Sequence, residues 1–397
     1  MNNADVPGTG AAGEMDSKNK NFDVIVVGVG SMGSSACYHL AKRGVRVLGL
    51  ERFDIPHGMG AAHGFSRMIR LAYFEHPDYV PLLRRSYALW TELAAELGRE
   101  VMLITGGLMI GPPGAHVFEG SLRSVRQYDL PHELLDIAET SRRFPQFKLP
   151  EDFRVLHDHK AGLVLPERAV AGYAEMAMRR GAELHGQEPI VSWEAPASQV
   201  IVTTTKARYS ADRVIFCGGA WTDKLVRDLG VPLTVTRQPL AWVWPKSPQL
   251  FELGKMPVWI LEHRDGSNHY GFPMLPDNPG FKLASHKRST PVDVDHLDRS
   301  PNDADEQAIR GVLKDFIPAA DGPLLSLRVC MYTNSPDFNF IIDRHPRHAN
   351  VFVACGFSGH GFKCASALGE VLAQLALDGR CPLPVEFLQL KRFGVGT

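Results

Sequence analysis

Three short segments carry residue types that can do chemistry. RVCMYTN (Arg328 to Asn334) places a thiol, Cys330, two residues before the phenol of Tyr332. HGFSRMIR and GFSGHGFK each combine glycine and histidine with a cation, and they end at Arg70 and Lys363. Such cations can bind an anionic substrate in a partly dry cleft, where an unpaired charge is costly. A buried cysteine by itself is most often a small hydrophobic residue, so the chemistry depends on the fold that brings these segments together.

The elements nearest the N-terminus predict a dinucleotide site. FDVIVVGVGSMGSSACYHLAKRGVRVLGLE begins at Phe22 and has the pattern of a buried strand, a glycine-rich turn, a helix and a second buried strand. Gly28, Gly30 and Gly33 stand in GxGxxG register, which suits a tight turn, close approach to a pyrophosphate and close helix packing. Glu51 ends the second strand, where a carboxylate can accept hydrogen bonds from a ribose diol. This unit alone does not separate NAD from FAD.

The rest of the chain predicts two kinds of structure that interleave. A helix is expected over Tyr79 to Leu97, and LVLPERAVAGYAEMAMRRGAEL predicts a helix followed by a strand. After Pro232, the segments LAWVWP, MPVWILE and NHYGFPM favour antiparallel strands. NVFVACGFSGHGFKCASALGEVLAQLALDG returns to a strand, a glycine-rich turn and a helix.

Composition limits the classes of partner. The 397 residues have a formal net charge of −1, so nothing indicates a general attraction to nucleic acid or to an anionic membrane. The 6 cysteines form no CxxC pair and no zinc-like spacing, so we expect no metal site and a reducing, intracellular setting. No apolar run is long enough to span a bilayer. Residues 1–20 are polar and glycine-rich without the apolar segment of a signal peptide, so we expect a disordered N-terminal extension.

Taken together, the GxGxxG unit and the three motifs resemble the monomeric sarcosine oxidase family of flavoproteins. That family includes N-methyltryptophan oxidase and pipecolate oxidase and is related to the amadoriases. The resemblance runs from Phe22 to about Gly379, and its most specific part is CMYT followed by FIID and GFSGHGFK. It implies FAD attached covalently by a thioether from Cys330 to the 8α-methyl carbon of the flavin. We expect the other cysteines to be packing residues.

The resemblance also implies the fold. We expect an α/β protein with an FAD-binding, Rossmann-like domain of the glutathione-reductase type and an interleaved α+β substrate domain built on an antiparallel sheet. The FAD-binding domain is expected to be discontinuous, over 21–103, 163–232 and 337–397. The substrate domain is then expected over 104–162 and 233–336.

The matching motifs assign further roles. Arg70 and Lys363 are expected to bind the substrate carboxylate, with Tyr332 as an active-site tyrosine and Glu75 at the substrate loop. Lys282 and His286 match a lysine and a histidine on a strand beside the flavin, and the lysine is expected to promote the reaction with oxygen, because a fixed positive charge stabilises superoxide. The residues expected at the cofactor, besides the glycine-rich turn, Glu51 and Cys330, are His63, Ser66, Arg67, Gly359, His360 and Gly361. The last helix is expected to point its N-terminus at the flavin and to stabilise negative charge there.

The chain departs from sarcosine oxidase at four places. It has His269-Tyr270 where that enzyme has two tyrosines, Asn334 for a lysine, Ala62 for a second histidine and Phe65 for an acidic residue. We expect these changes to alter the pocket walls and to leave the flavin machinery intact. Which N-alkyl amino acid is the substrate therefore stays open.

The implied reaction is oxidation of a secondary amino acid by a monomeric enzyme, with O2 as acceptor and H2O2 as product. The chain ends GVGT, without the targeting tripeptide of peroxisomal members, so we expect a cytoplasmic location. A flavin dehydrogenase with a non-oxygen acceptor, and an enzyme for pipecolate or a fructosyl amino acid, stay open as alternatives. An NAD-dependent dehydrogenase would leave RVCMYTN and GFSGHGFK unexplained, and a flavoprotein acting on RNA would need a basic surface.

Overall fold

The computed structural model describes residues 20–395 except 197, 279 and 287–289. Most of the predicted N-terminal extension, residues 1–19, lies outside the described residues. The first strand, β1, begins at Lys20.

An eight-stranded sheet is built around the predicted strand–turn–helix–strand unit. That unit is β1 (Lys20–Val27), α1 (Ser31–Lys42) and β2 (Val47–Leu50). β1 is parallel to β2 and to β12 (Arg208–Phe216), and β12 is parallel to β19 (Val351–Cys355). The remaining strands are β9 (Glu183–His185), which is parallel to β2, and the antiparallel β10 (Ile190–Glu194), β11 (Val200–Thr204) and β18 (Ile341–Arg344).

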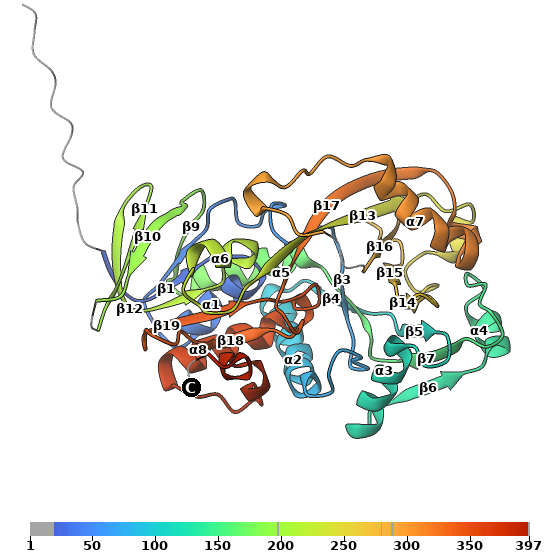
Figure 1. The fold of residues 1–397 in the computed structure, drawn as a ribbon, viewed down its shortest axis with the longest axis horizontal. Coiled ribbons are helices and arrows are strands. Elements are labelled where there is room, and N and C mark those ends of the chain that lie inside the picture. Colours follow the sequence, from blue (N-terminus) through green and yellow to red (C-terminus); the bar gives the residue numbers. More distant parts are fainter. Residues whose placement is uncertain (1–19, 197, 279, 287–289, 396–397) are drawn as a thin grey trace, which may run out of the picture.

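Helices cover one face of this sheet, as Figure 1 shows. α1 packs against both α5 (Pro166–Arg179) and α8 (Ala365–Asp378), and α8 also contacts α2 (Tyr79–Leu97). Val24 of β1 packs in the core with these helices, whereas Ile25 packs in a different core cluster, because successive side chains of a strand point to opposite faces. In the described part of the chain, no helix has the length and apolar character needed to cross a membrane.

A second eight-stranded sheet contains the alternating segments, in the order β17-β13-β16-β15-β14-β5-β7-β6. Each described neighbouring pair is antiparallel except β14 with β5, which are parallel. In Figure 1 the long β13 and β17 extend from this sheet toward the first one. Its strands are β5 (Gly107–Gly111), β6 (His132–Leu135), β7 (Arg154–Asp158), β13 (Thr234–Val243), β14 (Val258–Glu262), β15 (Asn268–Phe272), β16 (Phe281–Ser285) and β17 (Leu324–Asn334). The further helices are α3 (His116–Gln127), α4 (Ile137–Arg143), α6 (Thr222–Leu225) and α7 (Asp303–Phe316).

A third, small sheet is built from strands within residues 67–164. It consists of β3 (Arg67–Ile69), β8 (Gly162–Val164) and β4 (Met102–Ile104), with β8 in the middle. The predicted domain boundaries at 103/104 and 162/163 fall inside β4 and β8, so they cut through this sheet. Apart from Lys20, the strands of each large sheet lie within the residue ranges predicted for one domain. The division into two domains itself stays a prediction.

Candidate active site

One cavity of about 580 Å³ is lined by residues of both large sheets. Glu51 follows β2, Cys330 lies on β17, and Lys363 lies in the turn that precedes α8. The predicted site residues that line it are Gly28, Gly30, Glu51, Arg67, Arg70, Glu75, His286, Cys330, Tyr332, Gly359, His360, Gly361 and Lys363. Gly33, His63, Ser66 and Lys282 lie behind this lining. The fold thus brings together motifs that are far apart in the sequence.

The glycine-rich turn has the shape that a dinucleotide phosphate needs. Gly28 has φ +88°, and a Cβ at this position would overlap the carbonyl oxygen of Cys217. A Cβ at Gly33 would overlap the carbonyl oxygen of Gly28, whereas Gly30 has open space at that point. Gly30 is also the N-cap of α1, whose first turn has no acidic residue and no side-chain cap. Free N–H groups at a helix N-terminus bind phosphate well, so this backbone fits the pyrophosphate of FAD.

Glu51 presents a carboxylate to the same part of the cavity. Its Oε2 accepts a hydrogen bond from the N–H of Val29 at 2.9 Å, and its Oε1 accepts one from Phe53 at 3.0 Å. The imidazole of His57 lies 3.5 Å from Oε1. Burial raises the pKa of Glu51, but His57 and the two backbone N–H groups outweigh this effect and lower it. The ionised carboxylate can accept the hydrogen bonds of a ribose diol.

Cys330 is buried in the wall of the cavity, with 2% of its surface exposed. The Nη2 atom of Arg67 lies 3.6 Å from its Sγ. The same guanidinium donates to the carbonyl oxygens of Ala61 at 2.7 Å and Ser66 at 2.9 Å, so the cation is held in place. The sulfur atom of Cys330 therefore has a fixed cation as its neighbour. Among the described residues, Cys217 beside Gly28 is the other cysteine that lines the cavity.

Lys282 holds the backbone of the HGFSR segment. Its Nζ donates to the carbonyl oxygens of Gly64 at 2.7 Å and Ser66 at 2.6 Å, and to Oγ of Ser66 at 3.1 Å. Glu167, which sequence reasoning missed, accepts from the N–H of Gly64 at 2.6 Å. Burial, and then the charge of Arg67, lowers the pKa of Lys282 well below its usual value. These contacts position the segment that carries Arg67, while a role of Lys282 toward oxygen stays a prediction.

The two predicted carboxylate-binding cations, Arg70 and Lys363, differ in how many of their hydrogen-bond donors already have a partner within the protein. Arg70 donates through Nη2 to both carboxylate oxygens of Glu75, at 2.7 and 2.6 Å, and through Nη1 to the carbonyl oxygen of Ala72 at 2.9 Å. Its buried Nε has no hydrogen-bond partner in the described part of the structure. Lys363 donates to the carbonyl oxygen of His360 at 2.8 Å. An ammonium group has three donors, so Lys363 has capacity left for a ligand.

The pKa values of Glu75 and Lys363, which lie close to Arg70, are shifted strongly. Burial raises the pKa of Glu75, but the nearby Arg70, followed by His360 and Lys363, lowers it to about 2. Burial, and then Arg70, lowers the pKa of Lys363 to about 8. At neutral pH the group therefore holds two cations and one carboxylate, with a net positive charge that suits an anionic ligand.

Three histidines of the predicted site, His63, His286 and His360, are neutral at pH 7. Burial is the largest cause in each case, and it lowers the pKa of His63 to about 3 and those of His286 and His360 to about 4. The Nε2 of His360 lies 2.9 Å from the carbonyl oxygen of Phe338, which can only accept, so Nε2 carries the proton. Its Nδ1 then accepts from the hydroxyl of Tyr73 at 2.5 Å. The carbonyl of Phe338 thus fixes the tautomer of His360, and Tyr73, a residue outside the predicted set, bonds the other ring nitrogen.

Tyr332 is held between two elements of the site. Its hydroxyl lies 3.1 Å from Nδ1 of His286, and burial raises its pKa well above the usual value. A Cβ at position 359 would lie 2.6 Å from the Tyr332 ring, and Gly359 has φ +82°. Only glycine suits that position in the GFSGHGFK turn. The GFSGHGFK turn therefore packs against the ring of Tyr332, which lies on β17.

The structure corrects the expectation that the four departures from sarcosine oxidase alter the pocket walls. Of the four, Ala62 lines the cavity, as does Tyr270, whereas His269, Asn334 and Phe65 do not. His269 lies on the opposite face of β15 from Tyr270, because neighbouring strand residues alternate, and its Nδ1 lies 2.8 Å from Nε2 of His263. The lining residues that sequence reasoning missed include Met68, Phe74, Ile260, Asn268 and Phe272.

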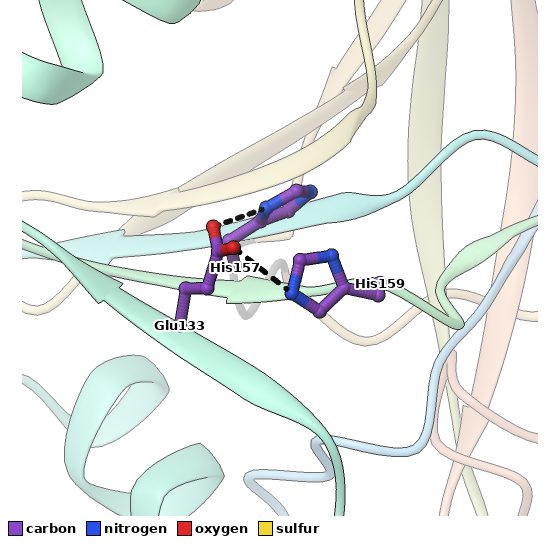
Figure 2. A group of neighbouring side chains, drawn as sticks. All are labelled: Glu133, His157 and His159. Carbon is purple, nitrogen blue, oxygen red and sulfur yellow. Dashed lines mark hydrogen bonds and ion pairs between the residues drawn. The ribbon is translucent and has the colours of Figure 1, made fainter.

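Two clusters elsewhere have the composition of metal sites. Figure 2 shows Glu133 between His157 and His159, with carboxylate-to-nitrogen distances of 3.4 Å to each. Arg143 also donates to the Glu133 carboxylate at 2.5 Å. The second cluster consists of Asp228, His345 and His348, and Arg347 donates to its carboxylate in the same way. In each cluster the carboxylate is therefore already paired with a cation, Arg143 for Glu133 and Arg347 for Asp228.

Replacing Glu75 with glutamine is expected to tighten the binding of carboxylates. A carboxylate ligand that binds the guanidinium of Arg70 would have to compete with Glu75 for it, and a charge-assisted hydrogen bond contributes about 1.5–3 kcal/mol. We therefore expect the Kd of acetate, measured by flavin absorbance changes, to fall by about tenfold or more. The unliganded variant should melt at a lower temperature, because Arg70 is left buried without its anion.

Glu133→Gln is the matched control, since it removes a carboxylate from an arginine outside the cavity. It should leave the Kd of acetate unchanged. Equal acetate affinities for the wild type and Glu75→Gln would show that Glu75 does not compete for the ligand.

Known proteins resemble the chain over nearly its whole length. A family model described as FAD dependent oxidoreductase matches residues 23–375. The chain is 44% identical over 375 residues to a monomeric sarcosine oxidase of Streptomyces avermitilis, covering 94% of this chain and 97% of that protein. It is 33% identical over 376 residues to an N-methyl-L-tryptophan oxidase of Yersinia pestis, covering 94% and 100%. A solved structure of NikD, an unusual amino acid oxidase essential for nikkomycin biosynthesis, has the same fold, with a TM-score of 0.83 at 23% identity over 94% of this chain and 98% of that one.

Proposed function

The chain belongs to the monomeric sarcosine oxidase and N-methyltryptophan oxidase family of FAD dependent oxidoreductases, and from this premise we propose that it oxidises N-methyl or other N-alkyl amino acids with O2 as acceptor. The observation that carries the proposal is the placement of Arg70 and Lys363 in the same cavity as the dinucleotide turn. A carboxylate bound to these cations lies in the cavity whose wall also carries Cys330.

The proposed reaction breaks the bond between nitrogen and its alkyl carbon. FAD, when bound, supplies the two-electron acceptor, which takes a hydride equivalent from the carbon next to nitrogen and delivers the electrons to O2. For an N-methyl substrate, the amino acid, O2 and water give the demethylated amino acid, formaldehyde and H2O2. The protein binds and orients the substrate, and it excludes water from this step.

The residues of the cavity favour the neutral form of the substrate amine. Arg70, Lys363 and Arg67 are cations, and among the described residues Glu75 is the carboxylate that contacts Arg70. His286 and His360 are neutral, so neither adds a charge at pH 7. Positive surroundings disfavour a protonated amine, and only the unprotonated amine has the lone pair that assists loss of hydride.

The covalent link is proposed at Cys330. The bond would join its Sγ to the 8α-methyl carbon of FAD; the thiol and the methyl group each lose one hydrogen, and O2 takes both as H2O2. The support from geometry is the buried sulfur in the cavity wall with Arg67 held beside it. We further propose that Lys282 promotes the reaction with oxygen and that the enzyme acts as a monomer in the cytoplasm.

The direct test is product analysis in air. The purified yellow protein is incubated with sarcosine, N-methyl-L-alanine and N-methyl-L-tryptophan, and H2O2 and formaldehyde are measured. We expect equal amounts of both products from at least one substrate. Formaldehyde that forms only with an added dye or quinone would replace the oxidase with a dehydrogenase, and the absence of both products with every N-methyl amino acid would refute the proposed substrate class.

Carboxylate binding is expected to weaken in alkaline solution. The pKa of Lys363 is lowered to about 8, so its ammonium is charged below that pH and loses its proton as the pH rises through it. The Kd of acetate, which does not titrate in this range, should therefore rise by up to about tenfold per pH unit above the pKa, until Arg70 alone binds the ligand. Lys363→Met should bind acetate weakly with no change between pH 7 and 10. A wild-type Kd that is constant over that range would contradict the assignment.

A further inference from the structure

One wall of the cavity is a strand with an unusual mixture of side chains. On β15, Asn268, Tyr270 and Phe272 alternate along the strand, and all three line the cavity. Ile260 of β14 pairs with Tyr270 in the sheet and lines the cavity as well. The wall is therefore apolar and aromatic except for two polar groups, the hydroxyl of Tyr270 and the amide of Asn268.

The Oδ1 atom of Asn268 is buried and has no hydrogen-bond partner among the described residues. The polar groups around it are used elsewhere. The N–H of His286 donates to the main-chain oxygen of Asn268 at 2.8 Å, and its Nδ1 lies 3.1 Å from the hydroxyl of Tyr332. Glu262, the cross-strand neighbour of Asn268, accepts from the N–H of Val117 at 2.7 Å. A buried amide oxygen without a partner destabilises a fold, so such groups normally have a ligand or water to bind.

Asn268 belongs to the substrate part of the cavity. The main chain of Asn268 is bonded to His286, and His286 lies close enough to Glu75, Lys363 and Arg70 for their charges to affect its titration. A substrate held by its carboxylate at Arg70 and Lys363 therefore has its side chain or N-substituent within the same space as the β15 wall.

We propose that Asn268 is a specificity-determining residue that hydrogen-bonds a neutral polar group, a hydroxyl or a carboxamide, on the side chain or N-substituent of the substrate. This inference rests on the proposed function. The substrate class is then an N-alkyl amino acid with a hydrogen-bond donor beyond the amine, and sarcosine lacks such a group. An enzyme site built to bond a polar group discriminates strongly against an analogue without it, because its own buried group is then unpaired.

The test compares polar and apolar substrates of matched size. One pair is N-methyl-L-serine and N-methyl-L-2-aminobutyrate, and a longer pair is N-methyl-L-glutamine and N-methyl-L-norleucine. We expect kcat/KM of the wild type to favour the polar member of at least one pair by about tenfold or more. Asn268→Leu, which has a similar volume, should bring that ratio close to one or invert it. Its unliganded form should melt at a higher temperature than the wild type, because the unpaired amide is gone.

Ile260→Val is the matched control, because it changes the same wall without changing its polarity. It should keep the polar preference of the wild type. Wild-type ratios near one for both pairs, or a polar preference that survives Asn268→Leu, would overturn the inference while the proposed function stands. If none of the four substrates and no other N-methyl amino acid yields H2O2 or formaldehyde, both the proposed function and this inference fail.

Discussion

Replacing Cys330 with alanine is expected to leave FAD bound by its dinucleotide contacts but fully extractable by acid. In the wild type, acid should precipitate protein and flavin together; in Cys330→Ala the yellow colour should move to the supernatant. The reason is that Cys330 lies buried in the cavity wall with Arg67 at 3.6 Å from its sulfur, while Gly28, Gly30 and Glu51 are expected to hold a different part of the ligand. The measurement is the flavin spectrum of pellet and supernatant.

Cys217→Ala is the matched control, because Cys217 also lines the cavity but lies at the glycine-rich turn. It should retain flavin in the acid pellet. A flavin peptide identified by mass spectrometry should contain Cys330 in the wild type. Wild-type flavin that is released entirely into the supernatant would refute the thioether and favour a non-covalent flavoenzyme.

Replacing Lys363 with methionine is expected to cost most of the catalytic efficiency toward amino acid substrates at pH 7. Lys363 is 6% exposed and, among the described residues, donates one hydrogen bond, to the carbonyl oxygen of His360, so we expect its other donors to bind the substrate carboxylate. Loss of a hydrogen bond to a charged group costs about 1.5–3 kcal/mol, which corresponds to roughly a tenfold to hundredfold loss in kcat/KM. Methionine keeps the length and packing of the side chain.

Lys224→Met provides the comparison, since Lys224 also lines the cavity but bonds Asp293 at 2.8 Å and Asp295 at 2.6 Å. It should lose much less of kcat/KM than Lys363→Met. Flavin content and melting temperature separate a binding effect from misfolding. If Lys363→Met keeps wild-type efficiency with normal flavin content, the carboxylate is bound elsewhere.

Local patterns allowed much of the fold to be predicted. The helix expected over Tyr79 to Leu97 has these bounds as α2, and the strand–turn–helix–strand unit is β1, α1 and β2. Both depend on the period of apolar residues and on glycines that close a tight turn, which are properties of short segments. The parallel pairing of β14 with β5 was missed, because pairing between distant strands leaves no local pattern in either of them.

The candidate site was predicted through motifs, and its motifs do meet in one cavity. Motif matching identified Arg70 and Glu75 separately, but neither motif indicates that two hydrogen bonds of 2.7 and 2.6 Å join the two side chains. Motif matching also assigned Lys282 a place beside the flavin, which stays a prediction, while the structure adds that its Nζ is hydrogen-bonded to Gly64 and Ser66. Hydrogen-bond partners depend on three-dimensional placement, which spacing along the chain does not specify.

The sequence by itself determined the dinucleotide turn, the family and the identity of the motifs, because each of these is encoded in a contiguous stretch. Only the tertiary structure decided which side chains form the substrate wall. The alternation along β15 puts Asn268 and Tyr270 in the cavity and turns His269 away, and this follows from which face of the strand the rest of the fold covers. Strand register and burial are properties of the whole packed chain, so a residue-by-residue comparison cannot assign them.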